Sequence, residues 1–194
     1  MFENDQYEKK ELHTLAECWL KGQPFKKDEM TENGKHQCVH YGELFTKYGV
    51  VIDQVDSRTD SNPIRISEQG DILFPASDVT PIGLTKCSAI NKQGVVLGGD
   101  IIIMRPIAGL NSVYLSYAIR MQKEQLLSRV TGAVVRHISA KGLRSVIIPA
   151  PPRTLQDGFE MILRQSDKSK LTNCRCSKMS TGKNLKRRRK DDFY

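Results

Sequence analysis

In this chain of 194 residues, the side chains best suited to bind a ligand are the basic ones between positions 136 and 144. Arg136 and His137 stand side by side, and Lys141 and Arg144 follow shortly after. A guanidinium group either forms a bidentate pair with the O6 and N7 atoms of guanine or bonds a phosphate, and periodicity does not separate the two. A second basic segment, LKRRRK at 185–190, either binds phosphates through charge alone or keeps a tail soluble.

The charge distribution along the chain supports a polyanion as partner and limits where it binds. The formal net charge is +8, but residues 1–163 hold 19 Lys+Arg and 19 Asp+Glu, whereas residues 164–194 hold 11 and 3. Within the neutral body, residues 1–119 hold 12 basic and 16 acidic residues, and residues 120–163 hold 7 and 3. A basic half on a neutral domain favours a polyanion, although solvated surface explains such an asymmetry equally often. Recognition by the body would therefore depend on locally placed basic side chains.

Motifs for catalysis are absent from the sequence. It has no GxGxxG, no Walker loop and no HExxH, no NPPY or DPPY of methyltransferases, and no convincing nuclease-type (D/E)xK set. Its carboxylates are dispersed, so no pair stands out for acid–base chemistry. His36 and His40 have a spacing that suits a metal on a helix, but Gly34 and Gly42 flank them and Val39 favours extended backbone. We therefore predict no catalytic centre and no metal site.

The five cysteines and the apolar runs indicate the compartment. The cysteines are odd in number and scattered, and the pair Cys174 and Cys176 is separated by one residue, too few for a zinc knuckle. Reduced thiols are expected. No apolar run approaches the roughly 20 residues that span a bilayer, and the charged start MFENDQYEKKEL lacks the apolar core of a signal peptide. The expectation is a cytoplasmic protein with no membrane partner.

The basic residues belong to a block at 131–152, TGAVVRHISAKGLRSVIIPAPP, that joins the two halves of the chain. The turn glycine Gly132, the apolar run 133–135 and the β-branched run 146–148 before a proline cluster predict two short strands that flank a basic crossing.

Elsewhere the hydrophobic periodicity predicts further helices and strands. The segment from Tyr41 to Gly49 is expected to hold a short helix or turn, and residues 75–83 an ordered surface loop. The other expected elements are helices at 7–21, 111–128 (capped by Asn111) and from Leu155 (capped by Thr154), and strands at 50–52, 72–74 and 101–104.

Taken together, these segments resemble one target-recognition half of the DNA-specificity (S) subunit of type I restriction–modification enzymes. The order and spacing of several pieces carry the resemblance, which covers most of the chain. The pieces are HYGELFTKY at 40–48, QGDILFPASD at 69–78, GGDIIIMRP at 98–106, NSVYLSYAI at 111–119, and the block at 131–152 with Gln156 shortly after.

The resemblance implies an α+β (mixed α/β) fold with a twisted β-sheet and short helices. Residues 1–152 would form a target-recognition domain that reads part of a bipartite sequence in double-stranded DNA. Residues 153–194 would form a C-terminal spacer and docking helix with a basic tail. Such a subunit is not an enzyme and needs no cofactor of its own. It directs a methylation (M) subunit that uses S-adenosylmethionine and a restriction (R) subunit that uses ATP and Mg²⁺.

Candidate site residues follow from the resemblance and the basic cluster. Arginine and lysine would hold phosphates, and polar loop side chains would read base edges. The DNA-contact candidates are Arg136, His137 and Lys141 in the central block, Ser77 and Asp78 in the first loop, and Lys47 beside the aromatic cluster. The docking candidates, for the M subunit or a second copy, are Leu155, Phe159 and Ile162.

The chain departs from the family pattern in two ways. It shows one recognition domain, so it resembles a half subunit, and two copies about a two-fold axis would recognise an inverted repeat. The segment 179–183 resembles the end of the family's helical arm but follows Leu163, the last clear stripe residue, by only sixteen positions. The arm is therefore expected to be shortened. The alternatives are a protein-interaction or non-specific DNA-binding module, and an enzyme whose motifs are unrecognised.

Overall fold

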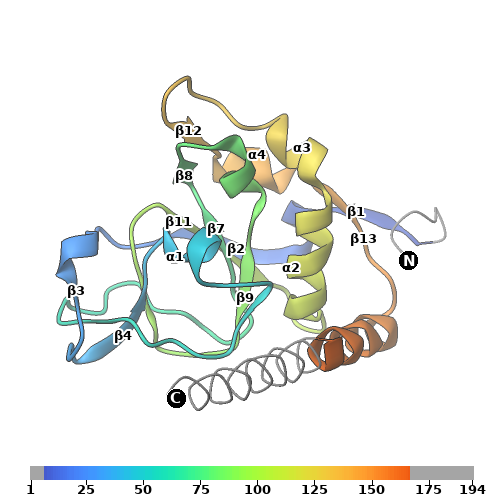
Figure 1. Ribbon diagram of the computed structural model, residues 1–194. Helices are drawn as coiled ribbons and strands as arrows, with labels where there is room; N and C mark the ends of the chain where they lie inside the picture. Colours follow the sequence, from blue (N-terminus) through green and yellow to red (C-terminus); the bar gives the residue numbers. More distant parts are fainter. Residues whose placement is uncertain (1–6, 167–194) are drawn as a thin grey trace, which may run out of the picture. The chain divides into compact units, whose positions relative to one another are not determined.

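The two apolar runs that the sequence marks as buried strands lie next to each other at the centre of a sheet (Figure 1). The computed structural model describes residues 7–166, and within them β7 (Ile72–Pro75) pairs antiparallel with β11 (Ile101–Pro106). All of β7 and the first four residues of β11 are buried, as expected for strands covered on both faces. The sheet has the order β2-β11-β7-β9-β5, with β2 (Ala16–Lys21), β9 (Ser88–Ile90) and β5 (Val51–Ile52).

A second, four-stranded sheet has the order β10-β4-β6-β3. Its strands are β10 (Val96–Leu97), β4 (His36–Val39), β6 (Arg58–Thr59) and β3 (Met30–Thr31). A turn that contains Asn33 and Gly34 connects β3 to β4. The core joins apolar side chains of both sheets with Leu44 of α1 (Glu43–Thr46), the short helix expected there. These strands and short helices confirm the α+β class.

The long helix predicted from Asn111 is present but broken. The Asn111 side chain accepts a hydrogen bond from the Tyr114 amide at 3.0 Å, so the predicted cap is confirmed. The helix divides at Gln122 into α2 (Ser112–Met121) and α3 (Lys123–Leu127). In α3, the Gln125 amide donates to the Ile147 carbonyl and accepts from its N–H, both at 2.9 Å. These two bonds orient α3 toward the strand that contains Ile147.

The helix predicted over residues 7–21 is wrong. The segment forms β1 (Lys9–Glu11), a 3-10 turn η1 (Leu12–Leu15) and β2. The 3-10 turn buries Leu12 and Leu15, three residues apart, which explains the helix-like spacing. Beyond it, β2 pairs along β11 and β1 pairs with β13 (Ile147–Pro149), so strand partners from distant segments override the local pattern.

The block at 131–152 holds a strand, a helix and a strand rather than two strands. The expected strand at 133–135 is wrong, because these residues form an exposed loop. A strand does follow, β12 (Arg136–His137), and then α4 (Ala140–Arg144), where a mere crossing was expected. The second predicted strand is present as β13, which pairs with β1.

The predicted surface loop at 75–83 is ordered and contains β8 (Ser77–Asp78) and the start of η3 (Pro81–Thr85). One further 3-10 turn, η2 (Lys27–Glu29), precedes β3. No helix within the described residues combines the length and apolarity needed to cross a membrane.

The chain divides into two compact units, residues 1–156 and 157–194. A helix begins at residue 153, one position before the predicted cap Thr154, and is described to residue 166. Its first turn is fixed to the first unit by Gln156, whose side chain is buried. That amide accepts from the Asn111 N–H at 2.9 Å and donates to the Pro151 carbonyl at 2.8 Å. The basic tail and the segment at 179–183 lie outside the described residues.

Candidate nucleic-acid interface

The fold brings four of the six DNA-contact candidates onto one two-stranded ribbon. β12 pairs antiparallel with β8, so that Arg136 lies opposite Asp78 and His137 opposite Ser77. The two strands come from segments far apart in the sequence and lie together at the top of the view in Figure 1. A fifth candidate, Lys141, is on α4, which follows β12 directly. We call this pair of strands the β8–β12 ribbon.

The loop that leads into β12 is held by its own hydrogen bonds. Thr131 and His137 each donate a backbone N–H to the carbonyl of the other at 2.9 Å. The Arg136 guanidinium donates to the Gly132 carbonyl inside this loop. Gly132 has φ 94°, and a Cβ there would lie 2.2 Å from the Val135 carbonyl oxygen, so only glycine fits. The loop therefore has a defined conformation.

The segment from Arg129 to Arg144 is positively charged, and Asp78, which lies opposite Arg136 in the ribbon, directs its carboxylate to the Val79 N–H and the Thr80 hydroxyl. It contains Arg129, Arg136, Lys141 and Arg144 and neither Asp nor Glu. The Arg129 guanidinium donates to neutral oxygens, among them the Ser145 carbonyl at 2.9 Å. Lys141 is exposed, and the Arg144 guanidinium lies 5.9 Å from the centre of the Trp19 ring. Lys141 and Arg144 are exposed and Arg129 and Arg136 are half-buried, and basic groups gathered on one segment favour contact with a phosphate backbone.

Ser77 faces inward, and the half-buried Asp78 is bonded to the turn that follows it. Ser77 is only 6% exposed, and its hydroxyl donates to an Asp100 carboxylate oxygen at 2.8 Å. The Asp78 carboxylate accepts from the Val79 N–H at 2.7 Å and from the Thr80 hydroxyl at 2.8 Å. In this arrangement both side chains brace the ribbon. Reading a base edge would require them to give up these bonds, so their DNA contact stays a prediction.

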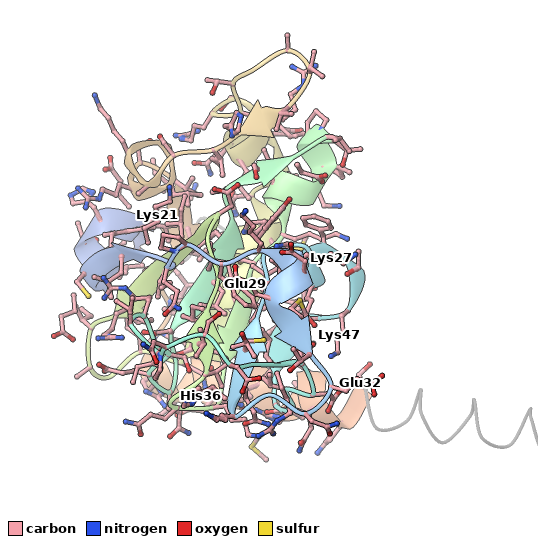
Figure 2. All side chains as sticks on the ribbon, turned by 90° about the vertical axis from the view of Figure 1, so that its left-hand side faces the viewer. Lys21, Lys27, Glu29, Glu32, His36 and Lys47 are labelled. Atoms are coloured by element: carbon pink, nitrogen blue, oxygen red, sulfur yellow. The ribbon has the colours of Figure 1, made fainter. Side chains whose placement is uncertain are left out.

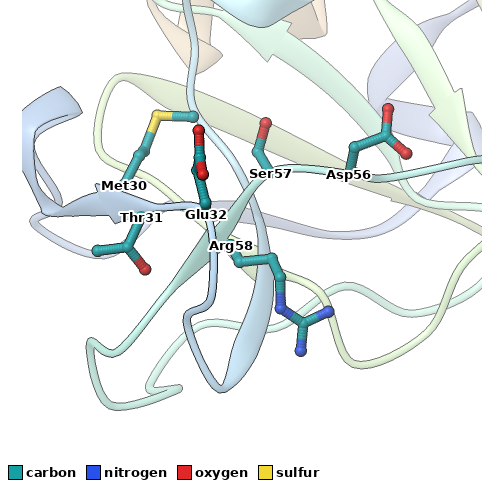
Figure 3. Close-up of a pocket in the computed structure, with 6 residues that line it drawn as sticks. All are labelled: Met30, Thr31, Glu32, Asp56, Ser57 and Arg58. Atoms are coloured by element: carbon teal, nitrogen blue, oxygen red, sulfur yellow. The ribbon is translucent and has the colours of Figure 1, made fainter.

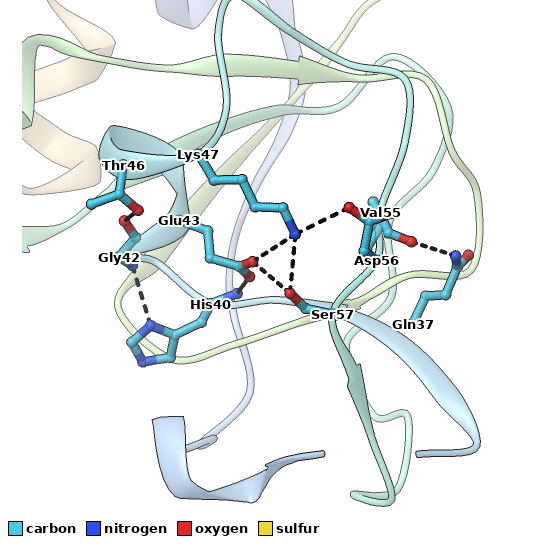
Figure 4. Close-up of polar contacts among 9 residues, drawn as sticks. All are labelled: Gln37, His40, Gly42, Glu43, Thr46, Lys47, Val55, Asp56 and Ser57. Atoms are coloured by element: carbon cyan, nitrogen blue, oxygen red, sulfur yellow. Dashed lines mark hydrogen bonds and ion pairs between the residues drawn. The ribbon is translucent and has the colours of Figure 1, made fainter. Parts of the chain in front are cut away.

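Lys47 is not brought to the ribbon. It follows α1, and its ammonium lies 3.4 Å from a Glu43 oxygen and 3.5 Å from an Asp56 oxygen (Figure 4). The Tyr48 ring is beneath it, at 5.3 Å from the ring centre. Two carboxylates near one ammonium leave little net attraction for a phosphate. The sequence placed Lys47 beside aromatics correctly but did not reveal its acidic partners.

Near Lys47 the surface carries charge of both signs. An open hollow of about 310 Å³ is lined by Met30, Thr31, Glu32, Asp56, Ser57 and Arg58 (Figure 3). The Arg58 guanidinium is turned to the backbone carbonyls of Gly34 and Lys35. Figure 2 shows lysines and glutamates intermixed on this side of the molecule. Such a surface lacks the one-sided charge of the ribbon segment.

His36 and His40 do not form a metal site with their neighbours. His36 is in β4, so the backbone is extended as expected, and no group of three potential metal ligands occurs among the described residues. His40 is 9% exposed, and burial lowers its pKa. Its Nδ1 accepts the Gly42 N–H at 3.2 Å, which requires the unprotonated nitrogen. The histidine is therefore a neutral part of the turn before α1.

A cleft of about 420 Å³ lies between β2 and the segment from His137 to Arg144. Trp19 forms part of its wall, stacked on Phe74 with ring centres 6.1 Å apart. The Trp19 Nε1 atom is buried without a hydrogen-bond partner. Trp19 is half-buried, so it packs on the core with one face and lines the cleft with the rest of the side chain.

The docking candidates lie on the helix at 153–166. Leu155 is 39% exposed and Ile162 is 67% exposed, whereas Phe159 is half-buried. Large apolar side chains this exposed are available to a partner. Whether they dock one stays a prediction.

Comparison with known proteins identifies the fold. No protein-family model matches the chain, and no curated protein sequence does. Several solved structures do. The S subunit of a type I restriction–modification system from M. genitalium aligns with a TM-score of 0.59 at 15% identity, over 87% of this chain and 41% of the other. The chain has the fold of part of a type I S subunit.

Two further structures agree. The HsdS subunit from Thermoanaerobacter tengcongensis gives a TM-score of 0.60 at 18% identity, covering 90% of this chain and 42% of that one. A structure solved for the complex assembly and conformational transition of the type I R-M system gives 0.64 at 18% identity, covering 95% and 44%. The chain thus spans less than half the length of each of these three structures. The resemblance drawn from the sequence is confirmed at the level of the fold.

Sequence reasoning missed one feature of the ribbon. Val79, Ile82, Val134 and Val135 are large apolar residues at its open end, and all are exposed. The run 133–135 was expected to form a short strand, because it is apolar and two of its three residues, Val134 and Val135, are β-branched. The only local signal against a strand was Gly132, which favours a turn but does not predict that the valines after it are exposed.

Proposed function

We propose that this chain is a DNA-sequence recognition module of a type I restriction–modification assembly and performs no chemistry of its own. The β8–β12 ribbon with α4 is the observation that carries the proposal, because it gathers Arg136, His137 and Lys141 on one part of an S-subunit-like fold. The major groove of B-DNA admits a two-stranded ribbon. Methylation and cleavage, with S-adenosylmethionine, ATP and Mg²⁺, would belong to the M and R subunits.

In this function the basic residues have separate roles. Lys141, exposed on α4, would bind a phosphate and contribute equally to every sequence. Arg136 would fix the loop through its bond to Gly132 and use its remaining donors on a phosphate or a guanine edge. His137, exposed beside it, would add a donor. Position and base preference would thus come from adjacent residues of one element.

Assembly with partners would use the helix that begins at residue 153. Leu155, Phe159 and Ile162 would contact the M subunit or a second copy of this chain. Two copies about a two-fold axis would place two recognition domains on an inverted repeat. Sedimentation of the chain with its DNA target tests this arrangement. If every species contains one copy of the chain, whether alone, with DNA or with the M subunit, the two-fold arrangement is refuted.

Binding selection from a random duplex pool, with the full chain and the M subunit present, tests the recognition function. We expect a defined sequence to emerge, with an affinity that falls steeply with salt. Lys141→Ala should weaken binding to all duplexes and reduce the slope of log K against log salt by about 1. Lys27→Ala is the matched control, since Lys27 is an exposed lysine on η2. Enrichment of no sequence, with no salt-dependent binding, refutes the proposal in favour of a protein-interaction module.

A further inference from the structure

The open end of the β8–β12 ribbon presents four large apolar side chains to solvent. Val134 is 84% exposed, Val79 72%, Ile82 52% and Val135 45%. In the register of the ribbon, Val135 and Val79 are the next residues outward from the pair Arg136 and Asp78. Ile82 is on η3, which packs against both strands. We call these four residues the apolar tip.

The tip is built to keep its shape while exposed. On one strand, the mutual bonds of Thr131 and His137 close the loop that carries Val134. On the other, the Asp78 carboxylate fixes the turn after β8, and Gly83 leaves space for it, since a Cβ there would lie 1.6 Å from that carboxylate. A loop without these bonds could bury its valines, whereas the bonded loop keeps them exposed to solvent. A fixed apolar cluster in water marks an interaction site.

The charge next to the tip identifies the occupant. The segment from Arg129 to Arg144 brings four basic side chains and no acidic one. An apolar protein surface would meet the valines but leave these charges without partners. Duplex DNA offers both kinds of contact, phosphates along the groove edge and, on its floor, the C5-methyl group of thymine as an apolar base feature.

We propose that the apolar tip reads thymine methyl groups in the major groove, with Val134 and Val135 as the principal contacts. Arg136 and Lys141 hold the flanking phosphates and so set the depth at which the valines enter. The inference rests on the proposed function and adds to it the side chains that distinguish bases. Specificity at the tip then comes from apolar contact, whereas Ser77 and Asp78 support it from within.

Deoxyuridine scanning of the selected duplex tests the inference directly. Each thymine is replaced in turn by deoxyuridine, which removes one methyl group and changes no hydrogen-bonding atom of the base. We expect one or two positions at which the full chain loses about fourfold in affinity, the value of one buried methyl. Val134→Ser combined with Val135→Ser should bind the thymine duplex several-fold more weakly and be insensitive to deoxyuridine at those positions. Ile64→Ser is the matched control, because Ile64 is an apolar residue 77% exposed outside the tip.

The outcomes separate this inference from the function it rests on. If the unmodified chain selects no duplex at all, the recognition function itself fails. If it selects a duplex that lacks thymine, or one in which deoxyuridine changes nothing, the methyl contact is overturned while recognition stands. Full deoxyuridine sensitivity in the double-serine variant also overturns it. Far-UV circular dichroism of that variant should match the unmodified chain, since both valines are exposed and support no core.

Discussion

The ion pair of Asp71 and Arg105 joins the central strands and gives the sharpest test of how the domain is held together. The Asp71 side chain is 0% exposed, and its oxygens accept from Arg105 at 2.9 and 3.1 Å and from the Glu68 N–H at 2.8 Å. Arg105 also pairs with Glu68 at 2.6 Å. The hydrogen bonds and charge of Asp71 raise the pKa of Arg105, so the guanidinium stays charged.

Asp71→Asn keeps the size of the side chain but removes its charge and one acceptor. The amide oxygen can replace Oδ1 or Oδ2 but not both, so Asn loses either the Arg105 Nε bond or the two bonds at Oδ2, and the bonds that remain lose the carboxylate charge that strengthened them. The free energy of unfolding should therefore fall by about 3 kcal/mol, the lower end for a broken buried pair. It is not larger because Arg105 keeps Glu68 and is 19% exposed. This is a large fraction of the stability of an ordinary domain.

Equilibrium unfolding in urea, followed by far-UV circular dichroism, measures the loss as a lower midpoint at constant slope. The effect should persist in 1 M NaCl, because salt screens a buried pair poorly. Glu8→Gln is the control, since the Lys10–Glu8 pair at 3.1 Å is exposed and should contribute less than about 1 kcal/mol. A loss below about 1 kcal/mol for Asp71→Asn, or simple additivity with Arg105→Gln, would refute the reasoning.

Three further predictions follow from single buried or strained positions. Because burial lowers the pKa of His40, the unfolded state binds more protons, so stability should fall as pH drops below about 6.5. In urea titrations, the free energy of unfolding should differ less between pH 5 and pH 7.5 for His40→Asn than for the unmodified chain, and an equal difference contradicts this. Burial raises the pKa of Cys38 and Cys87 to about 11, so Ellman's reagent at pH 8 should label neither thiol until urea unfolds the chain, as peptide mapping would show. Gly132→Ala should lower the free energy of unfolding by about 1–2 kcal/mol, because a Cβ there meets the Val135 carbonyl. It should also weaken binding to the selected duplex more than binding to unrelated duplexes, and equal losses would show that the loop does not contribute to sequence preference.

The net charge of +8 is not spread evenly over the chain. The excess lies in residues 164–194, most of which are outside the described part of the chain. Within the described domain, the positive segment is short and local, and it coincides with the ribbon. We therefore expect the domain and the tail to make separable contributions to DNA affinity, with sequence preference coming from the domain.

Local sequence determined the central strands, the cap at Asn111 and the short helix after Tyr41. An uninterrupted apolar run such as Ile101–Met104 has no polar side chains for a solvent-facing side, so the strand is buried on both faces. The Asn111 cap depends on atoms only three residues apart. In these cases the stabilising partner is nearby in the chain, and the residue pattern contains it.

Tertiary structure alone decided the fate of residues 9–21 and the make-up of the candidate site. Trp19 and Leu20 fit a helical stripe, but β11 offers them a strand partner, and backbone pairing with a distant segment outweighs a local preference. Likewise, the sequence supplied Arg136 and Ser77 as separate candidates, and only the pairing of β8 with β12 put them on one ribbon. That pairing turned Ser77 inward, because the register of a strand determines which side chains face solvent, and it left Val134 in the loop before the paired residues.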